Sequence, residues 1–210
     1  MSVVFPSLDA ACESTVAALE HDPFYRTISE QFAHQGARRR AALAEYFDYS
    51  IRQGSRLGRV VHPDEAHVGV AVWLLPQSPA VAERERLQKH TFLLRVLGEQ
   101  GWIAYDRMVD YMGVRARTIV GGDAWYLSIV AVAPQAQRRN LGIRLLTPTL
   151  AEADAADAVC YLETFSSRSM KFYQRLGFVT REAFDEPTAQ ARYTLMVRPS
   201  RNARSPWRST

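Results

Sequence analysis

The chain has few cysteines and no long apolar run, and these absences exclude several classes of protein. Only Cys12 and Cys160 occur among its 210 residues, so we expect neither a disulfide framework nor a metal site. No uninterrupted apolar run approaches the roughly 20 residues of a membrane span. The first residues also lack the basic and apolar regions of a secretory signal. We therefore expect a cytoplasmic protein that makes no contact with a membrane.

The charge of the chain is basic but dispersed. The formal net charge is +4, with 26 basic and 22 acidic residues. No recognition helix or aromatic stacking platform accompanies this charge, so we expect no nucleic-acid partner. The basic residues gather only in the segment from Arg198 onward, which has four arginines and two prolines. We predict a single domain over residues 1–198 and a disordered, basic tail over 199–210.

The N-terminal half of the chain predicts helices and one hairpin. A helix over 37–52 is expected to end at Gly54. Ser78 and Pro79 form a good helix start, an N-cap residue followed by proline. The remaining predicted elements here are a short helix over 22–31, hairpin strands over 57–61 and 67–75, and a helix over 78–111 broken near 98–101.

The C-terminal half alternates strands with helices. Such alternation predicts a partly parallel sheet covered by helices, to which the earlier hairpin adds an antiparallel portion. The fold class is therefore a mixed α/β sandwich. Pro148 lies inside one predicted helix and should remove a backbone hydrogen bond there. The predicted elements are strands over 125–132, 158–164, 178–182 and 191–197, and helices over 141–156 and 168–176.

Residues 137–143, between a predicted strand and a predicted helix, form a short basic turn. The first N–H groups of a helix have no partner within the helix and carry partial positive charge. Arg138 and Arg139 add formal charge beside them. The segment suits a bound phosphate group, although a simple turn with two surface arginines has the same sequence.

The order of this turn and the segments after it resembles the GNAT superfamily of acetyl-CoA-dependent N-acetyltransferases. The turn is followed by a strand with Leu162, Glu163 and Thr164, and then by the aromatic segment 172–178. A closer similarity, to the puromycin N-acetyltransferase group, rests on 70–73 with Pro76, on 125–127 and on these later segments. The resemblance implies the GNAT fold, in which a mixed, twisted sheet flanked by helices splays two strands to admit the cofactor.

The resemblance implies an acetyl-CoA-binding core over 125–180 and an acceptor pocket shaped by the N-terminal part. Asn140 stands where the family pattern has its first glycine, and asparagine tolerates a left-handed backbone. Serines stand at two positions where relatives often carry asparagine. The residues expected to bind acetyl-CoA are Val130, Ala131, Val132, Gln137, Arg138, Arg139, Asn140, Leu141, Gly142, Ile143, Ser166 and Ser169.

Two residues are candidates for catalysis. By the same resemblance, Tyr173 faces the thioester sulfur and donates a proton to the departing thiolate. The alternative is an aromatic pair with Phe172 that only packs. Glu163 is a carboxylate in an apolar strand, so it either accepts or orients the amine or is a paired structural residue.

The expected activity is transfer of an acetyl group from acetyl-CoA to a primary amine of a small molecule. The amine attacks the thioester directly, and backbone amides polarise the carbonyl. A protein or peptide amine is an alternative acceptor, and a non-catalytic acetyl-CoA-binding module is an alternative function. We expect a monomer or a homodimer.

Overall fold

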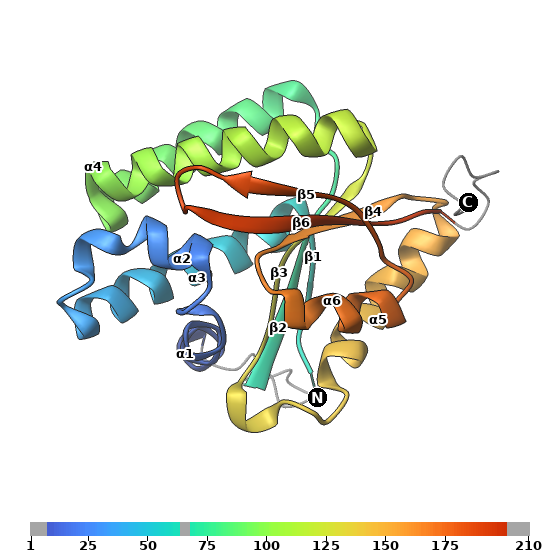
Figure 1. The fold of residues 1–210 in the computed structure, drawn as a ribbon, viewed down its shortest axis with the longest axis horizontal. Coiled ribbons are helices and arrows are strands. Elements are labelled where there is room, and N and C mark those ends of the chain that lie inside the picture. The colour runs from blue at the N-terminus through green and yellow to red at the C-terminus, as the bar shows by residue number, and fades with distance from the viewer. Residues whose placement is uncertain (1–7, 64–67, 201–210) are drawn as a thin grey trace.

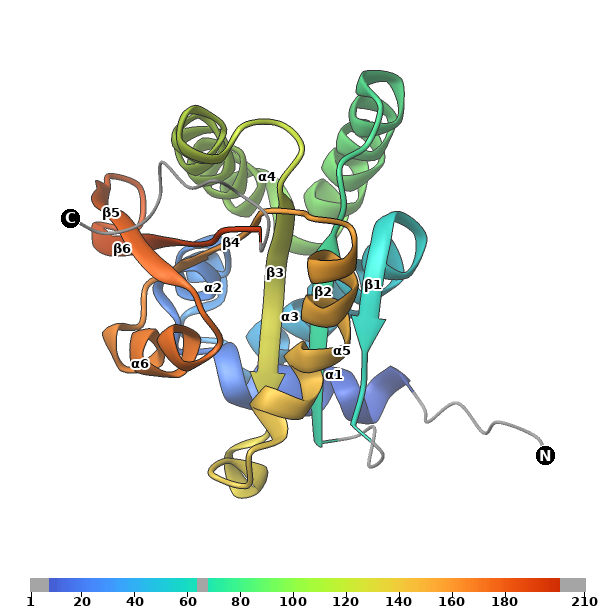
Figure 2. The same ribbon diagram turned by 90° about the vertical axis from the view of Figure 1, so that its right-hand side faces the viewer.

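A computed structural model describes residues 8–63 and 68–200. Six strands form one mixed sheet in the order β1-β2-β3-β4-β6-β5, with helices on both faces (Figures 1 and 2). The strands are β1 (Gly58–Val61), β2 (Gly69–Leu74), β3 (Trp125–Val132), β4 (Cys160–Thr164), β5 (Val179–Glu186) and β6 (Ala191–Arg198). The α-helices are α1 (Leu8–Leu19), α2 (Pro23–Ile28), α3 (Gly36–Leu57), α4 (Pro79–Val120), α5 (Leu141–Ala155) and α6 (Ser167–Arg175).

The predicted hairpin is confirmed, but the helix before it is longer than expected. Strands β1 and β2 pair antiparallel, with Val60 opposite Val72. Helix α3 continues through Gly54 to Leu57, so the predicted end at this glycine was wrong. A Cβ atom at Gly54 would lie 2.4 Å from Cγ1 of Val72. The glycine therefore lets the helix pack closely against β2 and does not end it.

Helix α4 is broken where the sequence predicted. Gly98 has φ 63° and ψ −177°, and Ser78 caps the N-terminus by accepting a hydrogen bond from the Val81 N–H. The rings of His90 and Trp102 lie 4.3 Å apart. Twelve residues would separate them by about 18 Å along a straight helix, so the two halves of α4 fold back on each other.

The predicted end of α4 near residue 111 was also wrong. The helix continues to Val120 and stops at Gly121, which has φ 79°. Helix-compatible residues fill the extra turns, and only Gly121 supplies the left-handed backbone that commonly ends a helix. The second half of α4 therefore packs across strands β4, β6 and β5 on one face of the sheet (Figure 1).

The alternating C-terminal elements agree with the prediction apart from the lengths of β5 and β6, and one further difference lies in the N-terminal helices. Strand β5 runs to Glu186 instead of residue 182, because it pairs with β6 along its whole length. Helix α1 was not predicted, and α2 ends at Ile28 before a short 3₁₀ segment. Arg198 belongs to β6 and not to a solvated tail: its guanidinium pairs with Asp154 at 2.7 Å. Residues 201–210 of the predicted tail and His67 lie outside the described residues.

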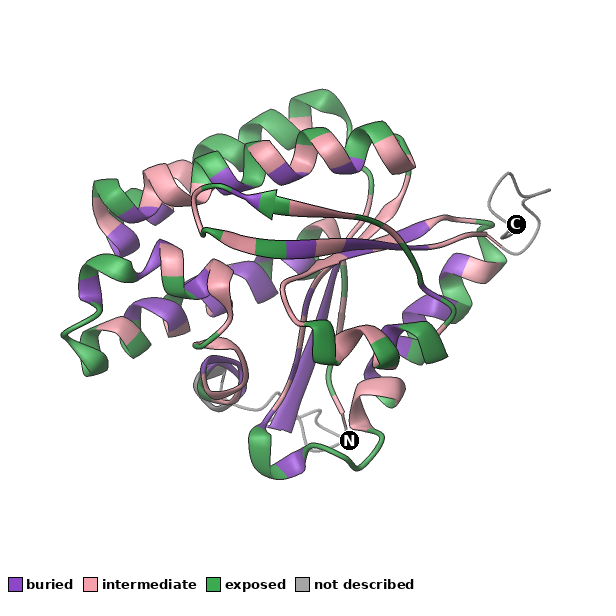
Figure 3. Cartoon of the chain, in the orientation of Figure 1, coloured by how far each residue is buried: buried purple, intermediate pink, exposed green. Residues whose placement is uncertain are grey.

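Two apolar clusters hold the sheet between its helices. One joins β2 and β3 to α1–α4, and the other joins β2–β4 and β6 to α5 and α6. Strand β2 lies in both clusters and is buried along nearly all its length, as Figure 3 shows in purple. Cys160 is fully buried, as its apolar surroundings predicted. Helices therefore pack against both faces of the sheet through apolar side chains.

Candidate active site

Strands β3 and β4 separate soon after they begin. They pair in parallel only at Trp125 with Cys160 and at Tyr126 with Tyr161. Beyond these pairs β3 continues to Val132 and β4 to Thr164. A gap thus opens in the middle of the sheet, and the peptide groups of β3 that face β4 have no strand partner there. The candidate residues Val130, Ala131 and Val132 lie on this part of β3.

A bulge in β3 accompanies the gap. Val72 of β2 lies opposite Ile129, whereas the next residue, Trp73, lies opposite Leu127. Ser128 is therefore an extra residue on β3. A bulge of this kind reverses the face to which the following side chains point and increases the local twist. Leu127 accordingly packs with α5 and Ile129 with the N-terminal helices.

The turn after β3 has the backbone of an anion cradle. Arg138 and Asn140 have φ values of 66° and 58°, so both are left-handed, as Asn140 was expected to tolerate. The side-chain amide of Gln137 donates through Nε2 to the backbone carbonyl of Val132 at 3.1 Å and ties the turn to the end of β3. Arg138 and Arg139 are exposed, and no carboxylate among the described residues pairs with them.

Gly142 lies in the first turn of α5 and meets the aromatic pair of α6. A Cβ atom at this position would lie 2.9 Å from Cζ of Phe172. The glycine therefore has a packing role besides exposing its N–H. Leu141 and Ile143 on either side of it are partly buried. The start of α5 is thus held directly against the helix that carries Tyr173.

The two candidate serines bond each other. The Ser166 hydroxyl accepts from the Ser169 N–H at 3.3 Å and from the Ser169 hydroxyl at 3.0 Å, which caps the N-terminus of α6. Residues of this kind commonly satisfy the free N–H groups at a helix start. The two hydroxyls therefore form hydrogen bonds within the cap of α6, and both side chains remain partly accessible.

Glu163 lies on β4 beside the gap, and no basic side chain among the described residues forms an ion pair with it. Its Oε1 atom is buried and has no hydrogen-bond partner among the described residues. Burial raises the pKa of this carboxyl to about 7, and the nearby Tyr126 hydroxyl opposes the rise. The Tyr126 ring stacks on that of Tyr161 with centroids 4.7 Å apart. At neutral pH the group can therefore both lose and accept a proton.

Tyr173 is buried in α6 between two other rings. Its ring centroid lies 5.1 Å from that of Phe172 and 6.1 Å from that of Phe178. Burial, and to a smaller extent the Asp22 carboxylate, raises the pKa of its phenol well above the usual value. The phenol is consequently protonated over the whole physiological pH range and is able to donate a hydrogen bond.

Sequence reasoning missed Asp22 and Tyr25, which lie at the start of α2 and near Tyr173. Asp22 caps that helix by accepting from the Phe24 N–H at 2.9 Å, and burial raises its pKa to about 6. Tyr25 is buried and lies close enough to Tyr46, Asp22 and Tyr173 for their charges to raise its pKa. The Asp-Pro cap was visible in the sequence, but only the tertiary fold brings it near Tyr173.

The comparisons with known proteins agree with this arrangement. Residues 97–180 match the family described as acetyltransferase (GNAT) domain. A structure described as histone acetyltransferase HPA2 and related acetyltransferase, from Corynebacterium glutamicum, is 26% identical, with 93% of each chain covered and a TM-score of 0.64. The fold is the GNAT fold. The matched GNAT domain supports an acyltransferase enzyme, and GNAT acetyltransferases use acetyl-CoA as their co-substrate.

Two further structures share the GNAT fold at lower identity. Arylalkylamine N-acetyltransferase 2 from Aedes aegypti is 12% identical, with 91% of this chain and 94% of that chain covered and a TM-score of 0.62. The polyamine N-acetyltransferase of Drosophila melanogaster, described as forming N-acetylagmatine, is 17% identical, with 75% and 80% covered and a TM-score of 0.52.

The described residues also bear on two other kinds of site. Over residues 8–63 and 68–200, no helix has the length and apolar character that crossing a membrane requires. In the same residues, no three His, Cys, Asp or Glu side chains gather closely enough to hold a metal ion.

Proposed function

We propose that the protein transfers an acetyl group from acetyl-CoA to a primary amine of a small molecule, in the gap between β3 and β4. One observation carries the proposal. The sheet opens directly beside Glu163, whose Oε1 atom is buried without a hydrogen-bond partner among the described residues and whose pKa burial raises to about 7. A carboxylate in this state is suited to accept a proton from an amine near neutral pH.

The turn after β3 supplies the cofactor end of this proposed site. The free N–H groups at the start of α5 and the exposed guanidiniums of Arg138 and Arg139 suit a diphosphate. The free edge of β3 suits the amide-bearing pantetheine arm, because it offers unpaired peptide groups. We assign the cofactor to Val130, Ala131, Val132, Gln137, Arg138, Arg139, Asn140, Leu141, Gly142, Ile143, Ser166 and Ser169.

Two side chains would act as proton acceptor and proton or hydrogen-bond donor in the reaction. Acetyl-CoA supplies an acetyl group on a thioester. Glu163 accepts a proton from the amine, whose nitrogen forms a bond to the acetyl carbon as the carbon–sulfur bond breaks. Tyr173 donates a hydrogen bond or proton to the departing sulfur. Since the pKa of Tyr173 lies above that of a thiol, near ~8.5 by analogy with cysteine, the hydrogen bond is the larger part of its effect.

The N-terminal helices would shape the acceptor pocket within a single domain over residues 1–198. The phenols of Tyr25, Tyr46 and Tyr105 lie close enough to affect one another's pKa values. Together with Asp22 they offer aromatic and acidic groups on the α2 side of the gap, which suit an amine with an apolar body. The structures described as arylalkylamine and polyamine acetyltransferases act on small amines, and the sequence similarity to the puromycin acetyltransferases points to the same class.

Thiol release from acetyl-CoA, measured over a panel of amines, tests this function. Each primary amine is paired with its N,N-dimethyl derivative, which keeps the charge and shape but yields no stable amide. We expect thiol release with some primary amines and none with their dimethyl partners, and mass spectrometry should find one acetyl group on the amine. Thiol release only with histone or other peptides would favour a protein acceptor. Binding of CoA by calorimetry without any thiol release would favour a non-catalytic module.

A further inference from the structure

Three tyrosine rings lie around the ammonium group of Lys89. Its Nζ atom lies 5.4 Å from the ring centroid of Tyr46, 5.9 Å from that of Tyr49 and 5.2 Å from that of Tyr105. The faces of aromatic rings carry partial negative charge and attract cations within about 6 Å. These three rings, called the tyrosine cage below, therefore form a place for a positively charged group.

The helix packing builds the cage from segments far apart in the sequence. Tyr46, Tyr49 and Gln53 follow one another on α3 at spacings of three and four residues, so they share one face of that helix. This face meets α4, because the Lys89 ammonium lies over the α3 rings and bonds Gln53. The break in α4 places Tyr105, from the second half of the helix, beside Lys89 from the first half.

The rings of the cage are held in place by contacts other than those with Lys89. Each ring also packs on an aromatic ring outside the cage. The pairs are Tyr46 with Phe47, Tyr49 with Phe92 and Tyr105 with Trp102, with ring centroids 5.5, 4.3 and 6.0 Å apart. Tyr46 is buried, whereas Tyr49, Tyr105 and Lys89 are partly exposed. A ligand can therefore reach the cage from the solvent, and the rings keep their packing when Lys89 moves out.

Lys89 itself is held weakly. Its Nζ atom donates to Oε1 of Gln53 at 3.3 Å, which is longer than the usual range of about 2.7–3.2 Å. No carboxylate among the described residues forms an ion pair with it. The buried Glu85, one helical turn earlier on α4, pairs instead with Arg56 at 3.0 Å. Movement of Lys89 into the solvent would therefore leave no buried charge without a partner.

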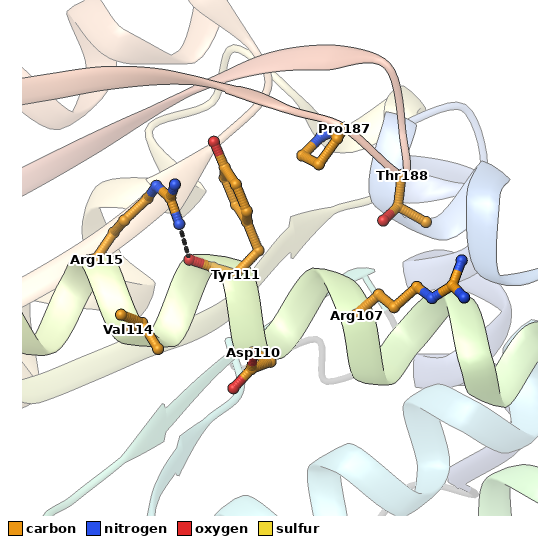
Figure 4. Close-up of a pocket in the computed structure, with 7 residues that line it drawn as sticks. All are labelled: Arg107, Asp110, Tyr111, Val114, Arg115, Pro187 and Thr188. Carbon is orange, nitrogen blue, oxygen red and sulfur yellow. Dashed lines mark hydrogen bonds between the residues drawn. The ribbon is translucent and has the colours of Figure 1, made fainter.

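The cage is wider than a bare ammonium group requires. A comparison lies at a hollow of about 420 Å³ beside the second half of α4, where Cζ of Arg115 is 3.3 Å from the ring centroid of Tyr111 (Figure 4). The Lys89 nitrogen is at least 5.2 Å from every ring of the cage. A methyl carbon packs about 3.5–4.0 Å from other carbons, and its bond to nitrogen adds about 1.5 Å. A methylated nitrogen at this position would therefore have its methyl groups in contact with the rings.

We propose that the tyrosine cage is a binding site for a quaternary ammonium group, and that Lys89 fills the cage when this ligand is absent. Aromatic cages are the usual protein sites for quaternary ammonium groups. Tyr46 and Tyr105 also belong to the proposed acceptor pocket, but the site is inferred from the geometry of the cage and does not depend on acetyl transfer.

The use of lysine at this position agrees with the proposal. Only Lys89 and Lys171 are lysines among the 26 basic residues of the chain. The planar guanidinium of an arginine stacks on a single ring, as that of Arg115 does. The compact ammonium of a lysine can lie between three rings, and its flexible stem lets it leave them. Lysine is therefore the basic residue that can fill the cage and still give way to a ligand.

The presence of only two lysines allows a test on the wild-type protein. Choline, a quaternary ammonium compound, should displace Lys89 into the solvent, where acetic anhydride modifies its amine faster. Lys171 is exposed on α6 and serves as the internal reference. The neutral control is 3,3-dimethylbutan-1-ol, which has the shape of choline without its charge. We expect choline to raise the ratio of modification at Lys89 to that at Lys171 severalfold, as mass spectrometry of peptides measures, and the neutral alcohol to leave it unchanged.

Matched variants measure the affinity of the cage for choline by calorimetry. Lys89→Met removes the competing charge but keeps an unbranched apolar side chain, so it should bind choline about tenfold more tightly than the wild type, the size of a desolvated cation–π contact. Lys171→Met should bind choline as the wild type does. Tyr105→Leu removes one wall of the cage and should weaken binding about tenfold, and Tyr49→Leu covers the case that this variant does not fold.

Several results would overturn the proposal. A modification ratio that choline leaves unchanged or lowers would mean that choline does not displace Lys89. Equal binding of choline and the neutral alcohol, or undiminished choline affinity in both tyrosine variants, would show that the cage does not recognise the charge. Equal affinities of Lys89→Met and the wild type would remove the role of Lys89. The absence of thiol release with any amine would contradict the proposed function and would change none of these binding results.

Discussion

Replacing Glu163 by glutamine should change activity and stability in opposite directions. The substitution keeps the size of the side chain and removes its charge. Burial holds the pKa of this carboxyl at about 7, against an ordinary value of 4.5. If Glu163 accepts the proton of the amine, it acts only when ionised. The kcat of the wild-type protein should then rise about tenfold between pH 6 and pH 8, as the ionised fraction rises.

The stability effect follows from the same raised pKa. Because the folded state binds the proton more tightly than the unfolded chain, the protonated carboxyl favours folding. This contribution is fully present below pH 4.5 and is lost as the pH rises through 7. A difference of this size in pKa corresponds to about 2.5 kcal/mol of lost stability between pH 5 and pH 8. Glutamine does not ionise, so the Glu163→Gln variant should not lose this stability. Its free energy of unfolding relative to that of the wild type should therefore increase as the pH rises.

Urea unfolding at pH 5 and pH 8 measures the stability part, and thiol release from acetyl-CoA measures the activity part. We expect kcat of Glu163→Gln at pH 8 to fall by about 10²–10⁴-fold. Asp22 also titrates in this range, but it is present in both proteins and cancels in the comparison. The reasoning would be refuted by equal pH dependence of unfolding in the two proteins, or by a variant with wild-type kcat across the pH range.

Three further substitutions test neighbouring parts of the site. Tyr173→Phe should leave CoA affinity nearly unchanged and lower kcat by about tenfold to 10²-fold, the lower end for a positioned acid, because its pKa is raised by burial; a wild-type rate at every pH would mean that the ring only packs. Asn140→Gly should fold as well as the wild type, whereas Asn140→Ala should cost about 1–2 kcal/mol because of its left-handed backbone, as urea unfolding would measure; equal stability of the two would contradict this. Gly142→Ala should cost about 1–3 kcal/mol by crowding Phe172, and an unchanged unfolding midpoint would count against that contact.

Local patterns in the sequence predicted much of the fold. The cap at Ser78, the break at Gly98 and the alternation of strands and helices after residue 125 all depend on nearby residues. The predicted helix end at Gly54 was wrong because this glycine serves tertiary packing. The helix continues through it, and the missing side chain lets α3 approach Val72. The predicted end of α4 was wrong for a related reason, since Ala116, Ile119 and Val120 in its extra turns pack on β4, β5 and β6, which lie far away in the sequence.

The candidate site, like the fold, could be predicted only in part from the sequence. The left-handed Asn140 and the position of Glu163 beside a gap in the sheet agree with the sequence-based reading. Asp22 was not identified, because it lies in an ordinary local pattern, a helix cap, and only the tertiary fold brings it near Tyr173.

Hydrogen exchange of the protein with a conjugate that joins CoA to the accepted amine through an acetyl linker tests the central claim most directly. If acetyl-CoA and the amine meet between β3 and β4, the conjugate should slow exchange of backbone amides in residues 127–132 and 137–143, and also in residues 22–28 of the α2 segment. CoA alone should protect the first two segments and not the third. Protection by the conjugate that leaves 127–132 unchanged, or that appears only at a different face of the sheet, would contradict the assignment of the site.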